Sequence, residues 1–216
     1  MRTRSGAFTL VELLVVLAVL SILAALSLAG LSKMGASSDR SKAVSNMRQI
    51  GTGIALFAAD NDGKLPGPLW PGQLAQFDPA RSGRLVRELA PCLGIPTPAA
   101  PKIEPLFVPP AYRKAVSPAF LDSARTYVLN MSVRDGDQVL IPWGNLATPP
   151  ATPPLKLASI PPQAWGFSDA DALHPRVIGA SWAGNTPKKP VHPPKRLAWF
   201  FNGSVGPVDD TMLAQP

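Results

Sequence analysis

Residues 8–30 read FTLVELLVVLAVLSILAALSLAG, and this stretch decides the fold. It contains one ionisable side chain, Glu12. A helix over these residues measures about 34 Å at ~1.5 Å per residue, enough to cross a hydrocarbon core of ~30 Å. A secretory signal peptide starts with a similar basic leader, but its apolar stretch is only ~7–15 residues long. We therefore predict a basic leader at residues 1–7 and one transmembrane helix at residues 8–30.

Glu12 is the unusual residue of this helix, because a carboxylate inside a span costs roughly 2.5–3.5 kcal/mol on insertion scales and normally marks a function. The predicted span contains no Lys or Arg that would pair with it. Cleavage before Phe8 would create an α-amino group four residues from Glu12, and this amine could belong to the same chain or to a neighbour. The alternative is that Glu12 lies at headgroup depth and is solvated.

The segment from Gly6 to Val16, GAFTLVELLVV, resembles the N-terminal signature of type IV prepilins and type II secretion pseudopilins. The resemblance implies that a prepilin peptidase cuts between Ala7 and Phe8 on the cytoplasmic face and N-methylates Phe8. It also implies that Glu12 pairs with the new terminus of a neighbouring subunit during filament assembly. The family usually has Gly directly before the cut, and we expect cleavage after Ala7 because Ala is also small.

The orientation of the span follows from the resemblance rather than from the charges beside it. Lys and Arg within about 20 residues of the span are more numerous after it than before it, which alone would keep the C-terminal part in the cytoplasm. The motif is more specific than a difference of two charges. We therefore predict a single-pass protein of the bacterial inner membrane, with its C-terminal domain in the periplasm or in an extracellular filament.

The helix is expected to continue beyond the span as an amphipathic segment, residues 31–60. Apolar residues recur there at spacings of four and three and form one stripe, while polar residues occupy the other faces. The stripe consists of Ala43, Met47, Ile50, Ile54 and Phe57. All 26 prolines fall at or after Pro66, so a long helix is compatible with the N-terminal part and not with the rest.

Residues 61–216 are predicted to form a small pilin-like globular domain. A brief helix is expected at 84–93, ended by Pro91, and a strand at 164–168. Two hairpins are expected, one from 126–133 and 138–141, the other from 197–201 and 204–208, where Asn202-Gly203 suits a type I′ turn. The Pro-rich segments 94–110, 142–162 and 187–194 are interpreted as long extended loops. The expected fold class is α+β, with a long N-terminal helix packed on a small antiparallel sheet.

Both ends of the predicted domain carry a second resemblance. Residues 46–51, NMRQIG, residues 57–66, FAADNDGKLP, and residues 200–205, FFNGSV, resemble the pilin-like proteins common in planctomycete and verrucomicrobial bacteria. The acidic turn at 60–63 lacks ligands at the first and last positions of an EF-hand loop. We therefore interpret it as a helix stop and not as a calcium site.

Residue types that support catalysis or metal binding are sparse. His174, His192 and Cys92 are the only residues of their types, so a zinc site would need carboxylates from scattered loops. Residues 168–171, Ser-Asp-Ala-Asp, would place two carboxylates on one face of a strand, but a solvated loop is the favoured interpretation. The chain has no nucleotide-binding or nucleophile-elbow motif. We predict no enzyme activity, no cofactor and no metal.

The net charge is +7, and the densest basic cluster consists of Lys188, Lys189, Lys195 and Arg196. Such a cluster is a candidate nucleic-acid contact, because phosphate binding depends on Lys and Arg. A solvated surface loop is the favoured alternative.

The primary functional hypothesis is a structural subunit of a type IV pilus-like or type II secretion pseudopilus filament. Its expected partners are prepilin peptidase, other pilin or pseudopilin subunits, the inner-membrane assembly platform and the lipid bilayer. The alternative is a singly anchored envelope binding protein, or a minor pilin, that contacts DNA, polysaccharide or an exported substrate. Replacement of Glu12 by Ala separates them, since only the filament role requires this carboxylate.

Overall fold

The computed structural model describes residues 9–146 and 149–215, without the side chains of residues 25–34. The chain divides into two compact units, Met1–Asp39 and Arg40–Pro216. Helix α1, Leu10–Asp60, contributes residues to both units. The long N-terminal helix predicted from the sequence is therefore confirmed over the described residues. We call Arg40–Pro216 the globular unit.

The helix stop predicted at residues 60–63 is also confirmed. Asp62 and Gly63 adopt positive φ angles of 53° and 80°. The Gly63 N–H donates to the carbonyl of Ala58 at 2.8 Å and closes the last turn of α1. A left-handed residue after the last helical turn is a common helix end, and Gly adopts it without strain.

The globular unit is built on an antiparallel sheet that has five strands among the described residues, in the order β1-β4-β7-β8-β9. Its strands are β1 Gly72–Leu74, β4 Arg125–Leu129, β7 Trp165–Asp169, β8 Arg196–Phe200 and β9 Val205–Val208. Two smaller ladders pair β2 Gln76–Phe77 with β3 Lys102–Ile103, and β5 Val133–Asp135 with β6 Gln138–Leu140. The short α-helices are α2 Leu85–Leu89, α3 Pro110–Ala115 and α4 Asp210–Ala214. Single 3₁₀ turns lie at Pro105–Phe107, Pro118–Phe120, Leu157–Ser159 and Ala183–Asn185.

The sequence predicted the first hairpin incorrectly. The predicted strand 126–133 is divided at Asn130, so that β4 joins the main sheet and only β5 pairs with β6. The side chain of Asn130 causes the break, because its Oδ1 accepts the N–H of Ser132 at 3.2 Å while its Nδ2 donates to the carbonyl of Trp165 at 3.0 Å. A side chain that bonds the backbone two residues ahead replaces a strand with a turn.

The closing hairpin is confirmed as β8 and β9, but its turn differs from the predicted type. Gly203 has a positive φ of 84°, whereas Asn202 does not. The Gly203 N–H donates to the carbonyl of Phe200 at 2.8 Å, and the Phe200 N–H donates to that of Ser204 at 2.9 Å. This geometry is the three-residue loop that ends in a left-handed glycine, which is the next most common hairpin connection.

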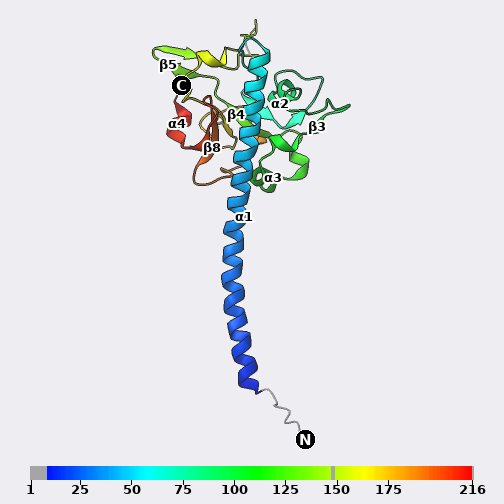
Figure 1. Ribbon diagram of the computed structural model, residues 1–216, viewed down its shortest axis with the longest axis vertical. Coiled ribbons are helices and arrows are strands. Elements are labelled where there is room, and N and C mark those ends of the chain that lie inside the picture. Colours follow the sequence, from blue (N-terminus) through cyan, green and yellow to red (C-terminus); the bar gives the residue numbers. More distant parts are fainter. Residues whose placement is uncertain (1–8, 147–148, 216) are drawn as a thin grey trace. The chain divides into compact units, whose positions relative to one another are not determined.

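The Arg40–Asp60 part of α1 packs across one face of the sheet, as Figure 1 shows. Its predicted stripe is confirmed, since Ala43, Met47, Ile50 and Ile54 are fully buried and Phe57 is half-buried. The partners from the sheet form a row of rings. In that row Tyr127, Phe167 and Trp199 follow one another across β4, β7 and β8, with ring centroids 5.3 and 5.5 Å apart.

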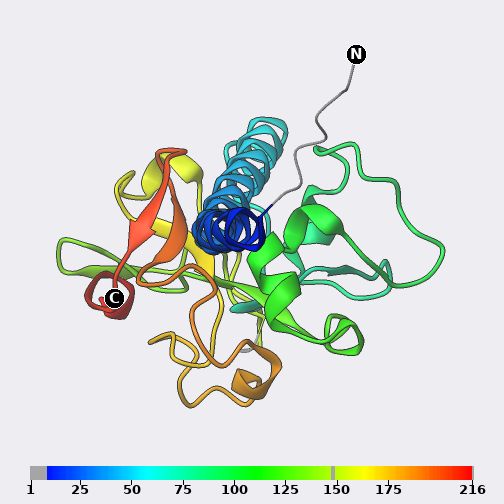
Figure 2. The same cartoon turned by 90° about the horizontal axis from the view of Figure 1, so that it is seen from below.

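The opposite face of the sheet is covered by segment 170–186 and by α4. Val128, Ala170 and Val177 form one small apolar cluster there, and Leu213 of α4 packs with Trp165 in another. In Figure 2, segment 78–124 (green to cyan) lies to one side of the globular unit, and β8, β9 and α4 (orange to red) lie to the other. The sheet thus has a helix-covered face and a loop-covered face.

Candidate functional site

Glu12 lies in the first turn of α1, where it forms a reciprocal cap with Thr9. The Thr9 N–H and hydroxyl both donate to Glu12 Oε2, at 2.8 and 2.9 Å, while the Glu12 N–H donates to Thr9 Oγ1 at 3.2 Å. This is a capping box, in which two N–H groups of the first turn that would otherwise lack partners are satisfied. The Thr-x-x-Glu spacing is a local pattern of the sequence, although the cap was not among the predicted features.

Apart from Glu12 and Ser21, the side chains of α1 between Leu10 and Leu23 are apolar and exposed. Exposed fractions run from 47% at Val16 to 79% at Leu10 among the large apolar residues between Leu10 and Leu23. Among the described residues, no helix is sufficiently long and apolar to qualify as a membrane span. The predicted cleavage site, Ala7 and Phe8, lies outside the described residues. Cleavage and N-methylation there stay predictions.

The predicted basic cluster does not form one exposed surface. Lys188 and Lys189 are exposed, and Lys195 contacts Asp209 with an Nζ to Oδ2 distance of 3.7 Å. Arg196 is 4% exposed, and its guanidinium binds Asp171 and Asp210. Burial alone would lower the pKa of Arg196, but the hydrogen bonds and charges of the two carboxylates raise it. Lys195 and Arg196 thus already contact carboxylates. Of the four predicted cations, Lys188 and Lys189 are therefore the two that remain as candidates for binding a ligand.

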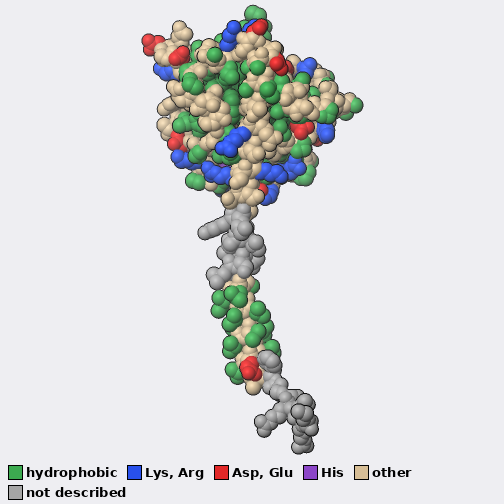
Figure 3. Space-filling model, viewed as in Figure 1, with side chains coloured by type: hydrophobic (Ala, Val, Ile, Leu, Met, Phe, Trp, Pro, Cys, Tyr) green, Lys and Arg blue, Asp and Glu red, His purple; other side chains and the backbone are tan. Residues whose placement is uncertain are grey.

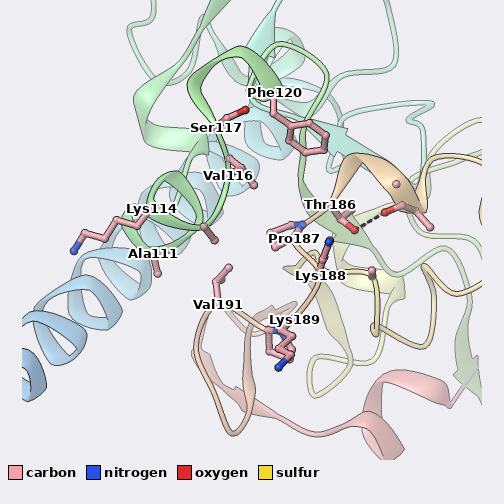
Figure 4. A pocket seen from close by; sticks show the side chains of 15 residues that line it. Ala111, Lys114, Val116, Ser117, Phe120, Thr186, Pro187, Lys188, Lys189 and Val191 are labelled. Carbon is pink, nitrogen blue, oxygen red and sulfur yellow. Dashed lines mark hydrogen bonds between the residues drawn. The ribbon is translucent and has the colours of Figure 1, made fainter.

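Lys188 and Lys189 line a groove of about 860 Å³. One wall comes from α3 and the residues after it, including Lys114, Val116 and Phe120, and the other wall comes from segment 183–191. Figure 4 shows the two walls facing each other, and the hydrogen bond from the Thr186 hydroxyl to the carbonyl of Ala183, 2.7 Å long, steadies the second wall. Lys114 was missed by sequence reasoning because it lies more than 70 positions before Lys188.

The acidic residues of segment 168–171 are buried, so their interpretation as a solvated loop is wrong. Asp171 binds Arg196 through both carboxylate oxygens, at 2.5 Å to Nε and 2.9 Å to Nη2. Asp169 Oδ2 accepts the Leu197 N–H at 3.1 Å and lies 2.8 Å from His192 Nδ1. The partners stand more than 20 positions later in the chain, which is why the local sequence gave no sign of burial.

Ser168 and His174 form a pair that resembles a nucleophile and its base, with 2.8 Å between Oγ and Nε2. However, His174 Nδ1 accepts the N–H of Arg176 at 3.0 Å, so the proton of the neutral ring is on Nε2 and is donated to Ser168. Burial, followed by the charges of Arg196 and Arg176, lowers the pKa of His174 to about 3. Because both side chains are fully buried and Nε2 already carries a proton, this pair stabilises the fold and does not activate the serine.

Acidic residues near the C-terminus also have structural partners. Asp209 is the N-cap of α4, accepting the Met212 N–H at 3.0 Å, and Asp210 binds Arg196. The part of the chain that the structure describes contains no group of three or more His, Cys, Asp or Glu residues that could hold a metal ion.

One segment of the chain matches a known protein family. Residues 2–28 match the family described as the prokaryotic N-terminal methylation motif. No curated protein and no solved structure matches the chain. The matched residues include all but the first residue of the predicted basic leader, the predicted cleavage site, the Thr9 and Glu12 capping box and the exposed apolar residues between Leu10 and Leu23. The chain therefore carries a prokaryotic N-terminal methylation motif, which supports a type IV pilin-like family.

Proposed function

We propose that this chain is a structural subunit of a type IV pilus-like or type II secretion pseudopilus filament. Prepilin peptidase cleaves it between Ala7 and Phe8 and methylates Phe8, and the mature subunit assembles through α1. Until assembly, residues 8–30 hold it in the bacterial inner membrane, with the globular unit in the periplasm. The methylation motif at residues 2–28 is the observation that carries this proposal.

The exposed apolar surface between Leu10 and Leu23 supports the same function. A large apolar patch on a protein surface marks a site of interaction with lipid or protein. Lipid would cover this surface before assembly, and the helices of neighbouring subunits would cover it afterwards through close packing. From the resemblance of residues 46–51, 57–66 and 200–205 we also predict that the chain belongs to the planctomycete and verrucomicrobial branch.

Glu12 has two roles in this proposal. In the isolated chain it caps its own helix, and both capping bonds use the same oxygen, Oε2. In the filament the carboxylate would also accept a hydrogen bond from the charged N-terminal amine of a neighbouring subunit. Oε1 is the oxygen that the capping bonds leave for this second bond. An ion pair in an apolar surrounding is strong only when hydrogen bonds satisfy the rest of the carboxylate, and the capping box provides these.

Two substitutions separate the capping role from the assembly role. Glu12→Gln keeps the capping box, because Gln also serves at the third helical position, but it removes the charge. Thr9→Ala removes the cap, at a cost of about 1 kcal/mol, and keeps the charge. We expect Glu12→Gln to insert normally and fail to form filaments, and Thr9→Ala to form them. Filament formation is measured by shearing and sedimentation, and the reverse result would limit Glu12 to its capping role.

Mass spectrometry of the mature N-terminus tests the processing step directly. We expect a chain that begins with N-methylated Phe8. Because Gly usually precedes the cut in this family, Ala7→Gly is expected to be cleaved at least as fast as the natural chain. A mature chain that begins elsewhere, or that keeps Met1, would contradict the proposal.

The groove lined by Lys114, Lys188 and Lys189 favours a second candidate, an anchored envelope protein or minor pilin that binds an anionic ligand. This candidate differs from the first in its dependence on Glu12. If Glu12→Gln leaves the behaviour of the cell unchanged while removal of the three lysine charges alters it, the binding role is supported.

A further inference from the structure

Arg125, the first residue of β4, carries a guanidinium that has no hydrogen-bond or ion-pair partner among the residues that the structure describes. The side chain is half-buried, and its Nε is fully buried without an acceptor. A buried charge normally has an anion or several hydrogen bonds beside it, because water no longer solvates it. The guanidinium of Arg125 therefore lacks a partner that a ligand would supply.

Other arginines of the globular unit do not share this position. Burial lowers the pKa of Arg84, Arg125 and Arg176. Arg84 donates to the carbonyl and the side-chain oxygen of Gln76, and Arg176 donates to two backbone carbonyls near the C-terminus. Lys and Arg side chains also gather along the lower edge of the globular unit in Figure 3, but exposed cations are solvated by water and need no partner.

Gly72 of β1 and the ring of Trp182 hold the guanidinium in place. Arg125 Cζ lies over the Trp182 ring, 5.6 Å from its centroid, and Trp182 packs against the apolar cluster of Val128 and Ala170. A Cβ atom at Gly72 would lie 2.6 Å from Arg125 Cδ, 3.0 Å from Arg125 Nε and 2.9 Å from Trp182 Cζ2. Any larger residue at position 72 would therefore displace the guanidinium or the ring.

A second cation adds to the positive charge at this position. Arg84 precedes α2 and is 7% exposed. Burial is the larger cause that lowers the pKa of Arg125, and the positive charge of Arg84 lowers it further. The carboxylate of Asp78 acts on Arg84 and binds the exposed Arg81, and it is not among the groups that shift the pKa of Arg125. Two partly buried cations that repel each other are stabilised when an anion binds beside them.

The chemistry of a guanidinium narrows the choice of anion. Its planar fork of N–H donors matches two oxygens of one carboxylate or phosphate, and such paired hydrogen bonds are among the strong ones in proteins. The Trp182 ring covers one face of the guanidinium, and Nε is buried against Gly72. An anion therefore approaches in the plane of the guanidinium, from the end that carries Nη1 and Nη2.

We infer that Arg125 binds an oxyanion through Nη1 and Nη2, while Gly72 and Trp182 keep its guanidinium in place. The oxyanion is a free phosphate or the carboxylate of a larger molecule, and both present two oxygens to the fork. The site lies in the globular unit, so binding requires neither cleavage of the leader nor a membrane anchor nor a filament. Hydrogen bonds to charged groups are strong enough that loss of the guanidinium should weaken binding by at least about tenfold.

The experiment uses the full chain in an uncharged detergent, with ¹⁵N-labelled arginine and nuclear magnetic resonance of the Nε–H groups. The signal of Arg125 is the one that disappears in Arg125→Gln. Inorganic phosphate and sodium acetate are the two probes, and sodium chloride at equal ionic strength is the reference. We expect the Arg125 signal to shift on titration with phosphate or acetate and not with chloride. The probe with the lower Kd shows whether the site prefers a phosphate or a carboxylate.

A matched pair of variants controls for net charge. Arg125→Gln should raise the Kd at least about tenfold, measured from the rise of the Tm with probe concentration. Arg134→Gln removes an exposed arginine of β5 and should leave the Kd unchanged.

Two further variants test the place that holds the guanidinium. Gly72→Ala keeps the charge of Arg125 but displaces the guanidinium, so it should also raise the Kd. Trp182→Leu removes the ring beneath the guanidinium and tests the same point if Gly72→Ala does not fold.

Two results would overturn the inference. One is an Arg125 signal that phosphate and acetate shift no more than chloride does, which would mean that the guanidinium meets only water and mobile ions. The other is a Kd that is the same in Arg125→Gln as in the natural chain, which would place the anion elsewhere. Neither result depends on filament formation, so failure of the proposed function and failure of this site are separate outcomes.

Discussion

Gly51 provides the sharpest test of how α1 packs on the sheet. A Cβ atom at this position would lie 2.1 Å from Trp199 Nε1 and less than 3.0 Å from two further atoms of the indole. Replacement of Gly by Ala inside a helix normally gains about 1 kcal/mol. Overpacking of a core costs about 1–3 kcal/mol, and here the helix backbone must move away from a ring that is stacked on Phe167. An approach of 2.1 Å belongs at the upper end of this cost, about 3 kcal/mol, so after the gain of about 1 kcal/mol we expect Gly51→Ala to destabilise the globular unit by about 2 kcal/mol.

Thermal unfolding of the full chain in detergent, followed by far-UV circular dichroism, measures this effect. A loss of about 2 kcal/mol lowers the Tm by roughly 4–8 °C for a domain of this size. Gly35→Ala is the matched control, because Gly35 lies in the same helix and a Cβ there would meet nothing within 4 Å. It should not lower the Tm of the globular unit.

A double variant isolates the contact itself. Trp199→Phe removes the indole atoms that Gly51→Ala would strike, so the two changes together should cost less than the sum of their separate effects, with a coupling of about 1 kcal/mol. A Gly51→Ala chain that is more stable than the natural one would refute the reasoning, since helix propensity would then outweigh the contact. Strict additivity would show that the strain lies elsewhere.

Three further predictions concern the buried polar groups. The pKa of His174 is about 3 in the folded chain against an ordinary 6.5, so below about pH 6.5 the unfolded chain binds the proton first. The neutral His174 therefore adds to the free energy of unfolding above that pH, and this contribution is lost, by up to about 1.4 kcal/mol per pH unit, as the pH falls towards 3. In this pH window, His174→Asn should flatten the pH dependence of the free energy of unfolding measured with urea. Asp171→Asn should cost about 3 kcal/mol in urea unfolding because it weakens the partner of buried Arg196, whereas Asp209→Asn at an exposed pair should cost under about 1 kcal/mol. Equal losses of stability in Asp171→Asn and Asp209→Asn would contradict the burial of the pair of Asp171 and Arg196. Asn130→Ala removes two hydrogen bonds that end β4, and a loss of about 1–3 kcal/mol is expected in the same assay; an unchanged midpoint would argue against this cause of the strand break.

Patterns that depend on neighbouring residues were the ones that the sequence predicted well. The stripe from Ala43 to Ile54 needs only the period of an α-helix, and its members are all buried. The closing hairpin was placed correctly because Asn202-Gly203 marks a turn between two apolar runs, although the turn type was wrong. The capping box of Thr9 and Glu12 belongs to this group as well, since its signal is local.

Features that depend on distant partners were not predictable in the same way. The divided strand at Asn130 depends on the carbonyl of Trp165, which lies 35 positions later. Burial of Asp171 depends on Arg196, and the groove depends on the approach of Lys114 to Lys188. Single-sequence patterns describe which face of an element is apolar, but they do not say which distant element will cover it.

The contact between Gly51 and Trp199 also sets the order in which the subunit can fold. The two residues are about 150 positions apart, and a ribosome that adds ~5–20 residues per second needs roughly 8–30 s to make that stretch. During this interval the buried stripe of α1 has no β8 to cover it. The fold can close only near the end of synthesis, so a chain that stops before residue 199 would leave the helix stripe open to aggregation and proteolysis.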